Sequence, residues 1–415
     1  MDRSPVGVTQ ATFSVFITRC QWRLLCNIQL SERLVHEADN DSSLAWAYYP
    51  KHMLCTTSQF TAILAGAMTI LGGCESTGPR LSRPLPTDHP RTYVAGFVIT
   101  PPAIDGKVDD RAWRQAPWTQ NFVDIEGSRK PTPEFQTRAK MCWDTENFYI
   151  LATLEEPHLW GTLTERDSII YHDNDFEVFI DPNGDRHTYN EYEINVLGTE
   201  MDLYMGRPYR SGGHFDMAWD FDGVRSAVRH SGTINDPSDR DKGWTVEIAI
   251  PWTSMADTAG VGCPPGNQDT WWVNFSRVQW PYEIVDGRYV KPEGAREDNW
   301  VWSPQDAIDM HRPEYWGLVQ FSTSQPGDIR FVVPDDVAVR AQLRDLLAAD
   351  EKYSASHGSP PKTIADLDGL WKPNPDLPMP RFSAGERGRL LVQEYRGQQW
   401  VVDARGRIHG PRSYQ

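Results

Sequence analysis

Cysteine is scarce in this chain, which has six cysteines among 415 residues. Only Cys142 and Cys263 follow Cys74. The sequence has no CxxC or HExxH motif and no other close grouping of cysteine and histidine. Zinc sites are built from such groupings, so the sequence argues against a zinc site. Cys142 and Cys263 could pair in an oxidising compartment, or Cys142 could be a buried free thiol.

Positive charge is also in short supply: 41 lysines and arginines stand against 57 aspartates and glutamates, and the formal net charge is −16. A chain with this balance repels phosphate groups. We therefore expect neither nucleic acid nor an anionic membrane surface as its main partner. Tryptophan, by contrast, is plentiful, with 17 residues. Its rigid, amphipathic ring suits stacking sites as well as hydrophobic cores.

The apolar run at residues 60–71 is too short to cross a bilayer, which takes roughly 20 residues. It fits the hydrophobic part of a secretory signal. The run ends in LGGC, which resembles the bacterial lipobox, where the cysteine (here Cys74) carries lipid and becomes the mature N-terminus. We therefore expect an exported lipoprotein that is anchored to the bacterial cell envelope through Cys74. Residues 1–74 would be an over-extended start plus the signal, and 75–96 a linker.

The chain is organised around residues 174–204, where two predicted strands alternate apolar and polar side chains. The first covers DFEVFID and the second EYEINV, with the turn formers PNGD between them. A period of two is typical of half-buried strands. Glu177 and Glu193 therefore lie on the polar face, and the same pattern at 243–250 adds Glu247. We expect a solvated, acidic sheet face.

Further short strands are predicted between clusters of Gly, Pro, Asn and Asp, at 137–143, 147–155, 224–229, 270–278 and 315–321. This pattern, with almost no helix, favours an all-β fold, namely an antiparallel β-sandwich over residues 97–322. The tail at 323–415 differs. Residues 335–353 have helical spacing, and 389–395 with 399–403 predict a small hairpin. No function can be read from this tail.

The acidic face could serve two purposes. A glycosidase needs two carboxyls roughly 5 to 10 Å apart, and neighbouring strands place side chains within that range. Glu177 and Glu193 could thus form an acid/base pair, although nothing in the sequence marks either for a raised pKa. The alternative is a hydrogen-bonding face for a polar ligand, on which Arg277, Arg225 or Arg138 could neutralise the acids. We prefer this second interpretation.

Aromatic residues accompany the acidic face in the sequence. Tyr171 precedes the strand of Glu177, and Trp300 and Trp302 alternate in DNWVWSP, so that both rings point the same way. Sugar rings have apolar C–H faces and hydroxyl groups at their edges. An aromatic slot backed by carboxylates therefore suits a saccharide. Packing in the core is the alternative for each ring.

Asp181, Asn183 and Asp185 have the alternating oxygen spacing of a calcium loop. The glycine and the acid that an EF-hand has at positions six and twelve are missing, because Arg186 and Tyr192 stand there. We therefore predict a hairpin turn, with structural calcium as the alternative. No other cofactor is expected.

Six motifs resemble carbohydrate-binding module family 9 in order and spacing, and together they cover roughly 97–322. They are IDG at 104–106 with Asp109, Asp110 and Trp113; WD before FYI at 143–150; DFEVFID at 175–181; GW and EIAIPW at 243–252; NFSR at 274–277; and EYWG at 314–317. The resemblance implies a β-sandwich of the jelly-roll, DOMON-like kind, with a sugar slot on its sheet.

The same resemblance implies the residues of that slot. Two aromatic residues would enclose a terminal sugar, the first at Tyr171, where members borne by xylanases have tryptophan, and the second at Trp302. The acid that binds hydroxyls falls at Glu177. An arginine of the family site falls at Glu193, which reverses the charge, so the sugar specificity is not implied. With Arg277 these are the predicted ligand-binding residues, and no catalytic or metal site is predicted.

We thus expect a protein that binds an oligo- or polysaccharide and assists its capture or breakdown without cleaving it. Two other functions stay open. One is an O-glycosyl hydrolase that acts through Glu177 and Glu193. The other is a haem or redox module, as some DOMON-fold relatives are, with axial ligands drawn from Met201, Met205 and His214. The sequence does not indicate the oligomeric state.

Overall fold

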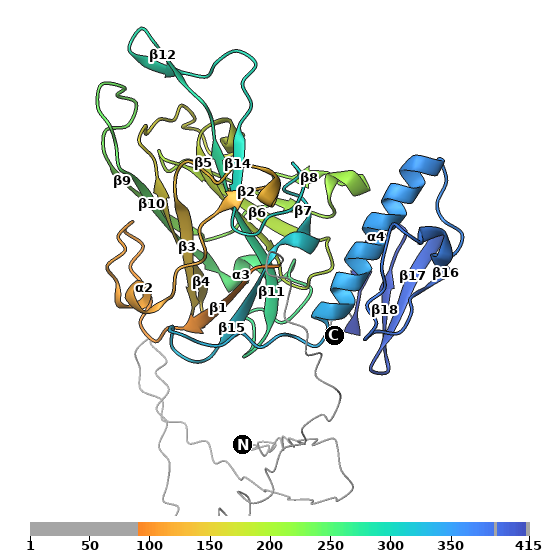
Figure 1. Cartoon of the computed structure of the whole chain (residues 1–415). Helices are drawn as coiled ribbons and strands as arrows, with labels where there is room; N and C mark the ends of the chain where they lie inside the picture. Colours follow the sequence, from red (N-terminus) through yellow and green to blue (C-terminus); the bar gives the residue numbers. More distant parts are fainter. Residues whose placement is uncertain (1–89, 386–387, 412–415) are drawn as a thin grey trace, which may run out of the picture. The chain divides into compact units, whose positions relative to one another are not determined.

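The computed structural model describes residues 90–385 and 388–411 (Figure 1). The predicted signal, Cys74 and most of the predicted linker lie outside the described residues. Among those described, no helix has both the length and the apolar composition that a membrane span needs. Strands dominate, and the longest helix described is α4 (Val337–His357).

Thirteen of the described strands join in one large sheet. They are β1 (Thr92–Phe97), β2 (Val123–Asp124), β3 (Thr137–Trp143), β4 (Asn147–Glu155), β5 (Asp175–Asp181), β6 (Tyr189–Asn195), β7 (Glu200–Met205), β8 (Phe215–Asp216), β9 (Arg225–Ser231), β10 (Gly243–Pro251), β11 (Thr270–Gln279), β14 (Asp298–Val301) and β15 (Gly317–Ser322). The sheet runs β8-β7-β6-β5-β11-β15-β1-β3-β4-β10-β9, with β14 and then β2 attached to β11.

Short helical turns and one hairpin connect these strands. The turns are α2 (Arg111–Gln115), α3 (Trp252–Met255), η1 (Gly127–Arg129), η2 (Ile170–His172), η3 (Tyr209–Ser211) and η4 (Pro313–Tyr315). The hairpin pairs β12 (Glu283–Val285) with β13 (Arg288–Val290), outside the large sheet.

The sheet is mixed, which corrects the prediction of a wholly antiparallel sandwich. Strand β1 lies between β15 and β3 and runs parallel to both, with Thr92 opposite Leu318 and Gly96 opposite Cys142. The predicted linker therefore extends too far, because the fold already begins at Thr92. Residues separated by more than 220 positions pair here, and no local sequence pattern reveals such a pairing.

The main hydrophobic core lies between the two arms of this curled sheet. Phe176 and Val178 of β5 and Phe275 of β11 belong to the same buried cluster as Val246 and Ile248 of β10. The even-numbered residues of β5 thus face the core, as the alternation predicted. The two layers expected of a sandwich are the two arms of one sheet.

The other face of β5, β6, β7 and β11 is also covered. Apolar side chains on it form a second core, which includes Phe179, Tyr189, Met201, Leu203, Met205 and Trp272. Ile170 of η2, Trp316 and the first helical residue Val337 pack onto them. The carboxylates that share this face are therefore enclosed by η2, which directly precedes β5, and by Trp316 and Val337, which are distant in sequence.

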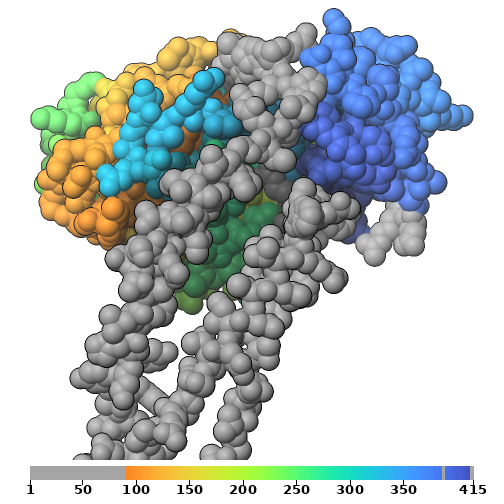
Figure 2. Space-filling view, turned by 90° about the horizontal axis from the view of Figure 1, so that it is seen from below, coloured from red at the N-terminus to blue at the C-terminus, as the bar shows by residue number. Residues whose placement is uncertain are grey.

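The C-terminal segment is larger than the predicted helix and hairpin. Strands β16 (Arg381–Gly385), β17 (Gly388–Tyr395), β18 (Gln398–Val402) and β19 (Ile408–His409) form a four-stranded sheet. Helix α4 buries Leu343 and Leu346 against this sheet in a third core with Trp400. The helix and the β17–β18 hairpin are confirmed, and β16 and β19 extend the hairpin on either side. Figure 2 shows this segment in blue as a compact body.

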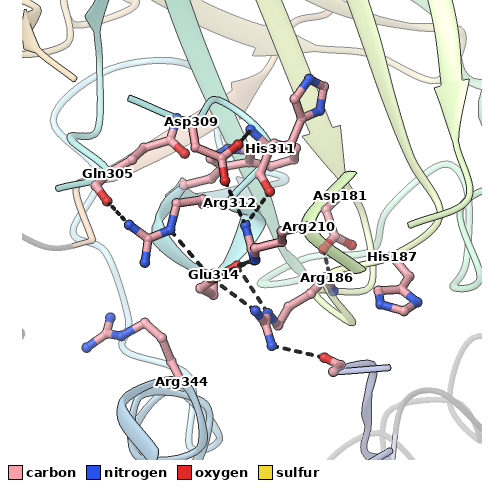
Figure 3. Close-up of polar contacts among 12 residues, drawn as sticks. Asp181, Arg186, His187, Arg210, Gln305, Asp309, His311, Arg312, Glu314 and Arg344 are labelled. Atoms are coloured by element: carbon pink, nitrogen blue, oxygen red, sulfur yellow. Dashed lines mark hydrogen bonds and ion pairs between the residues drawn. The ribbon is translucent and has the colours of Figure 1, made fainter. Parts of the chain in front are cut away.

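The turn between β5 and β6 attaches the C-terminal segment to the large sheet. Arg340 of α4 donates to the carbonyl oxygens of Gly184 and Asn183, the latter at 3.2 Å. Arg407 donates to Asp185 at 2.6 and 2.8 Å. Arg186, which is labelled in Figure 3, donates to the Gly406 carbonyl. These contacts make the C-terminal segment part of the fold.

The same turn confirms the predicted hairpin geometry at 181–185. Asp181 accepts the backbone N–H groups of Gly184 and Arg186 at 2.8 and 2.9 Å. Asn183 accepts the N–H of Asp185, and Asp185 accepts Arg407. The oxygens that a calcium loop would turn toward the ion are thus engaged by N–H and guanidinium donors.

Candidate functional site

Strands β5 and β6 place four carboxylates on the outer face of the sheet. Glu177 and Glu193 lie directly opposite each other, and Asp175 lies opposite Asn195. Glu191, two residues before Glu193, shares the same face by the alternation of the strand. We call Asp175, Glu177, Glu191 and Glu193 the carboxylate cluster. Their common face is what the period of two predicted.

The carboxylate cluster is buried, which corrects the prediction of a solvated face. Its four side chains are 0%, 4%, 5% and 1% exposed in chain order. The turn η2 lies over it, and the backbone N–H of Tyr171 donates to Glu193 Oε2 at 2.9 Å. Glu193 thus fixes the backbone of the aromatic residue that was predicted to form one wall of the slot.

Burial makes the charged form of these acids unfavourable. It raises the pKa of Asp175, Glu177 and Glu193 well above the usual range, and repulsion from neighbouring carboxylates adds to the effect. Burial and Glu177 raise the pKa of Glu191 to about 8. The nearest basic group is His311, whose Nε2 lies 4.0 Å from Glu191 Oε2. Burial lowers the pKa of His311 to about 4, so this imidazole is neutral at pH 7.

Several polar atoms of this face have no hydrogen-bond partner within the described residues. They are Asp175 Oδ2, Glu177 Oε2, Glu191 Oε2 and Ser276 Oγ. Ser276 of β11 is directly opposite Glu177 on β5 and is fully buried. Buried polar atoms in folded proteins nearly always have partners, so this group indicates a functional role.

Two exposed tyrosines accompany the carboxylate cluster. Tyr171 on η2 is 40% exposed and Tyr209 on η3 is 45% exposed. Burial raises the pKa of Tyr171, and the charges of Glu193 and Glu177 contribute. Burial, Glu191 and Tyr171 likewise raise the pKa of Tyr209 to about 12. Contacts place both residues beside the carboxylate cluster: the Tyr171 N–H donates to Glu193, and Tyr209 packs on His311, whose Nε2 lies 4.0 Å from Glu191 Oε2.

The two tyrosines are held by different contacts. The carbonyl oxygen of Tyr171 accepts Trp280 Nε1 at 2.8 Å, and Lys291 lies 3.5 Å above the Trp280 ring. Tyr209 meets His311 edge to face, with ring centroids 4.5 Å apart. Tyr171 is therefore held through its backbone and Tyr209 through its ring, and both side chains remain partly exposed.

An arginine network holds the loop that carries His311 (Figure 3). Arg210 donates to Glu314 at 2.8 Å and to the His311 carbonyl at 2.6 Å, and Arg186 donates to Glu314 at 3.1 Å. Burial alone would raise the pKa of Glu314, but Arg186 and Arg210 lower it to about 2. The loop is thus fixed over the sheet by charge pairs beside Tyr209.

Arg277 does not lie at this site, so the prediction that it neutralises the acidic face is wrong. It follows Ser276 in β11 and points to the opposite side, where its Nη2 donates to Glu156 at 2.9 Å. Its guanidinium lies 5.1 Å from the Trp300 ring centroid, and the side chain is 1% exposed. Arg277 is a buried structural residue.

Trp302 is not an exposed wall either. Its side chain is completely buried in the main core, with its ring centroid 5.8 Å from that of Phe275. A Cβ atom on Gly317 would lie 2.3 Å from the Trp302 ring, which shows how closely the backbone approaches. Trp300 belongs to the same core, so the two rings do share a side, as predicted, but that side faces inward.

Glu247 is separated from the carboxylate cluster. It lies on β10, in the other arm of the sheet, where it accepts the N–H groups of Asp105 and Gly106 at 2.8 and 2.6 Å. The indole of Trp113 donates to its other oxygen at 2.5 Å. Glu247 thus fixes the turn before α2, and the predicted three-stranded acidic face has two strands.

The candidate haem ligands also do not meet. Met201 and Met205 are buried in the second core, whereas His214 is exposed.

Among the predicted site residues, the structure brings together Tyr171, Glu177 and Glu193. Sequence reasoning missed Tyr209, which lies in a loop without periodicity. It also passed over Asp175 and Glu191, although the alternation placed both on the correct face.

The comparisons with known proteins concern the sheet domain. Residues 104–263 match the family model described as "Carbohydrate family 9 binding domain-like". The chain is 30% identical over 168 residues to Endo-1,4-beta-xylanase A of Thermoanaerobacterium saccharolyticum, and 29% identical over 162 residues to Exoglucanase XynX of Acetivibrio thermocellus. These matches cover 40% and 39% of this chain but 12% of either enzyme.

Two similar solved structures are a carbohydrate-binding module of family 9 from Caldicellulosiruptor kristjanssonii in complex with cellotriose and a putative carbohydrate-binding protein from Bacteroides uniformis. The first is 18% identical, covering 59% of this chain and 100% of its own, with a TM-score of 0.37. The second is 14% identical, covering 56% and 99%, with a TM-score of 0.42. On the family match over residues 104–263, this chain carries a carbohydrate-binding domain of the family 9-like kind.

Proposed function

We propose that this protein binds an oligo- or polysaccharide at a site whose mouth would be formed by the exposed Tyr171 and Tyr209, and that it does not cleave it. The observation that carries the proposal is the pair of exposed phenol rings beside a face of carboxylates. The matched family region, 104–263, contains both tyrosines and the carboxylate cluster. A xylanase and an exoglucanase among the relatives support a carbohydrate as the ligand class.

The chemistry of the mouth suits a sugar. Phenol rings offer apolar faces to the C–H groups of a pyranose, while their hydroxyls and nearby carboxylates can bond its edges. Glu177 and Glu191 keep 4% and 5% exposure, so a sugar that enters past Tyr171 would reach these two acids first. Glu193 serves instead to hold the Tyr171 backbone.

Binding without cleavage is favoured over hydrolysis by the surroundings of Glu177 and Glu193. A glycosidase needs one acid to remain ionised while the other holds its proton. Here the pKa values of both acids are raised by burial, and no basic side chain among the described residues pairs with either. We therefore expect no release of reducing ends from oligosaccharides.

Replacing either tyrosine by alanine tests the proposed mouth. Stacking of a nucleic-acid base on an aromatic ring contributes about 1–3 kcal/mol, and a similar contribution from a sugar face predicts a roughly tenfold higher Kd in Tyr171→Ala and in Tyr209→Ala. The Kd of each variant would be measured by calorimetric titration with the oligosaccharide selected on a glycan array. The control is Tyr353→Ala, whose ring stacks on His357 in α4.

Unchanged affinity in both variants, or an equal loss in Tyr353→Ala, would show that the sugar binds elsewhere. Melting temperatures of the three variants separate weakened binding from weakened folding. Because both side chains lie at the surface, 40% and 45% exposed, we expect the melting temperatures of Tyr171→Ala and Tyr209→Ala to stay near that of the parent.

We further propose that the protein is exported and anchored to the cell envelope by lipid on Cys74. The support is in the sequence, where the apolar run at 60–71 ends in LGGC. In Cys74→Ser we expect loss of labelling by a fatty-acid analogue and a shift of the protein from the membrane to the soluble fraction. A variant that keeps the label and the membrane location would refute the anchor. The control is Cys142→Ser, whose thiol is buried in β3.

A further inference from the structure

The carboxylate cluster has no cationic partner in the described part of the protein, and its acids would ionise readily only if a cation joined them. None of its four acids forms an ion pair with lysine or arginine there, and the nearest basic group is the His311 imidazole at 4.0 Å. Arg277, the cation nearest in the strand register, points to the opposite face and pairs with Glu156. Buried carboxylates in proteins are paired with a cationic group or coordinate a metal ion.

Three of these acids have the spacing of a coordination site. Asp175, Glu177 and Glu193 each offer one oxygen atom, and the three atoms all lie within 4.8 Å of one another. Calcium binds carboxylate oxygens at about 2.3–2.6 Å, so ligands on opposite sides of the ion are about 5 Å apart. The three oxygens can therefore surround one calcium ion.

A residue outside the acidic group points to the same ligand. The Ser276 hydroxyl is fully buried and has no hydrogen-bond partner among the described residues. Ser276 is directly opposite Glu177 in antiparallel strands. The two side chains therefore project from the same face, with their Cβ atoms about 5 Å apart. A buried hydroxyl oxygen beside unpartnered carboxylate oxygens would find its partner in a cation between them.

We propose that Asp175, Glu177 and Glu193 bind a divalent cation of the calcium class, with the Ser276 hydroxyl facing the same position. Glu191 adds a fourth carboxyl on the same strand face, and a nearby cation would favour its ionised form. Glu177 belongs to the proposed sugar site as well, but the cation site is inferred from the cluster alone and can be tested without sugar. A bound cation would supply the positive charge that the described side chains do not.

A second acidic group in the chain offers a matched control. Asp167, Asp202 and Asp220 also bring oxygen atoms within 4.8 Å of one another. There, however, Arg166 occupies the middle, donating to Asp202 at 2.7 Å and to Asp220 at 2.9 Å. A cation already balances this second group, so it should bind no calcium.

The test is a calcium titration of the full chain after treatment with a chelator, without sugar. Calorimetry with calcium chloride should show one equivalent bound, and the melting temperature should rise by about 5 °C when calcium exceeds its Kd a hundredfold. Magnesium chloride should bind more weakly, because that ion demands shorter distances and stricter geometry. Both responses should be absent in Glu177→Gln/Glu193→Gln and kept in Asp220→Asn.

A parent protein that neither takes up calcium nor melts at a higher temperature with it would overturn the proposal. A calcium response that persists in Glu177→Gln/Glu193→Gln, or that disappears in Asp220→Asn, would equally refute this location. Folding of the double variant is checked by its melting in chelator, where the loss of two repelling charges should leave it at least as stable as the parent. Because no sugar is present, the outcome is separate from that of the carbohydrate experiments.

Discussion

Trp302→Ala should lower the free energy of unfolding by about 3–5 kcal/mol, because truncating a large buried aromatic leaves a cavity in the core. Trp302 is completely buried beside Phe275, and the backbone at Gly317 lies against its ring. The surrounding strands cannot close easily over the space that an indole leaves. Urea unfolding followed by circular dichroism would measure the loss.

The control for this variant is Tyr171→Ala, which removes an aromatic ring that is 40% exposed. It should change the unfolding free energy by much less. Were Trp302→Ala instead to keep the parent's stability and lose sugar affinity, the ring would belong to the slot and our placement of it in the core would fail.

Arg277→Met should lower the free energy of unfolding by a similar amount, about 3–5 kcal/mol, because it leaves a buried carboxylate without its partner. Arg277 and Glu156 are 1% and 3% exposed in their side chains and lie 2.9 Å apart. Methionine can fill much of the space of the aliphatic stem, so the loss reports mainly on the charge. The double variant Arg277→Met/Glu156→Gln should recover a good part of the lost unfolding free energy.

An exposed pair supplies the comparison for Arg277. The side chains of Arg381 and Glu394 are 57% and 52% exposed and lie 3.8 Å apart. Arg381→Met should therefore lower the free energy of unfolding by less than about 1 kcal/mol. Equal losses in the two arginine variants, or no recovery in the double variant, would mean that the ion pair with Glu156 is not what Arg277 contributes.

Strand periodicity was sufficient to predict which acids share a face. The side chain of every second residue in a strand projects to the same side, so DFEVFID and EYEINV alone place Glu177 and Glu193 together. What covers that face is not a local property. The loop that carries His311 comes from a distant part of the chain. The η2 turn directly precedes β5, but it has no periodicity that would show it folding back onto the carboxylates. The prediction of a solvated face failed for this reason.

The errors at Arg277 and Trp302 have a different origin. Arg277 is two residues after Phe275, so the alternation already placed it on the core side, and its charge was wrongly taken as a sign of exposure. For Trp302 the alternation gave the correct side, shared with Trp300, but periodicity does not tell which side of a strand faces the core. Tyr209 lies in a loop, where no periodicity exists to be read.

The position of β1 has a consequence for how the chain folds during synthesis. Its parallel partner β15 follows it by more than 220 residues, so at about 5–20 residues per second the ribosome needs roughly 10–45 s to deliver the missing neighbour. Until then the edge of β1 that will pair with β15 presents unpaired N–H and C=O groups, which invite pairing with other chains. Since long-range pairing also slows folding, a nascent chain of this kind stands to gain from a chaperone that shields its first strand until residue 322 has emerged.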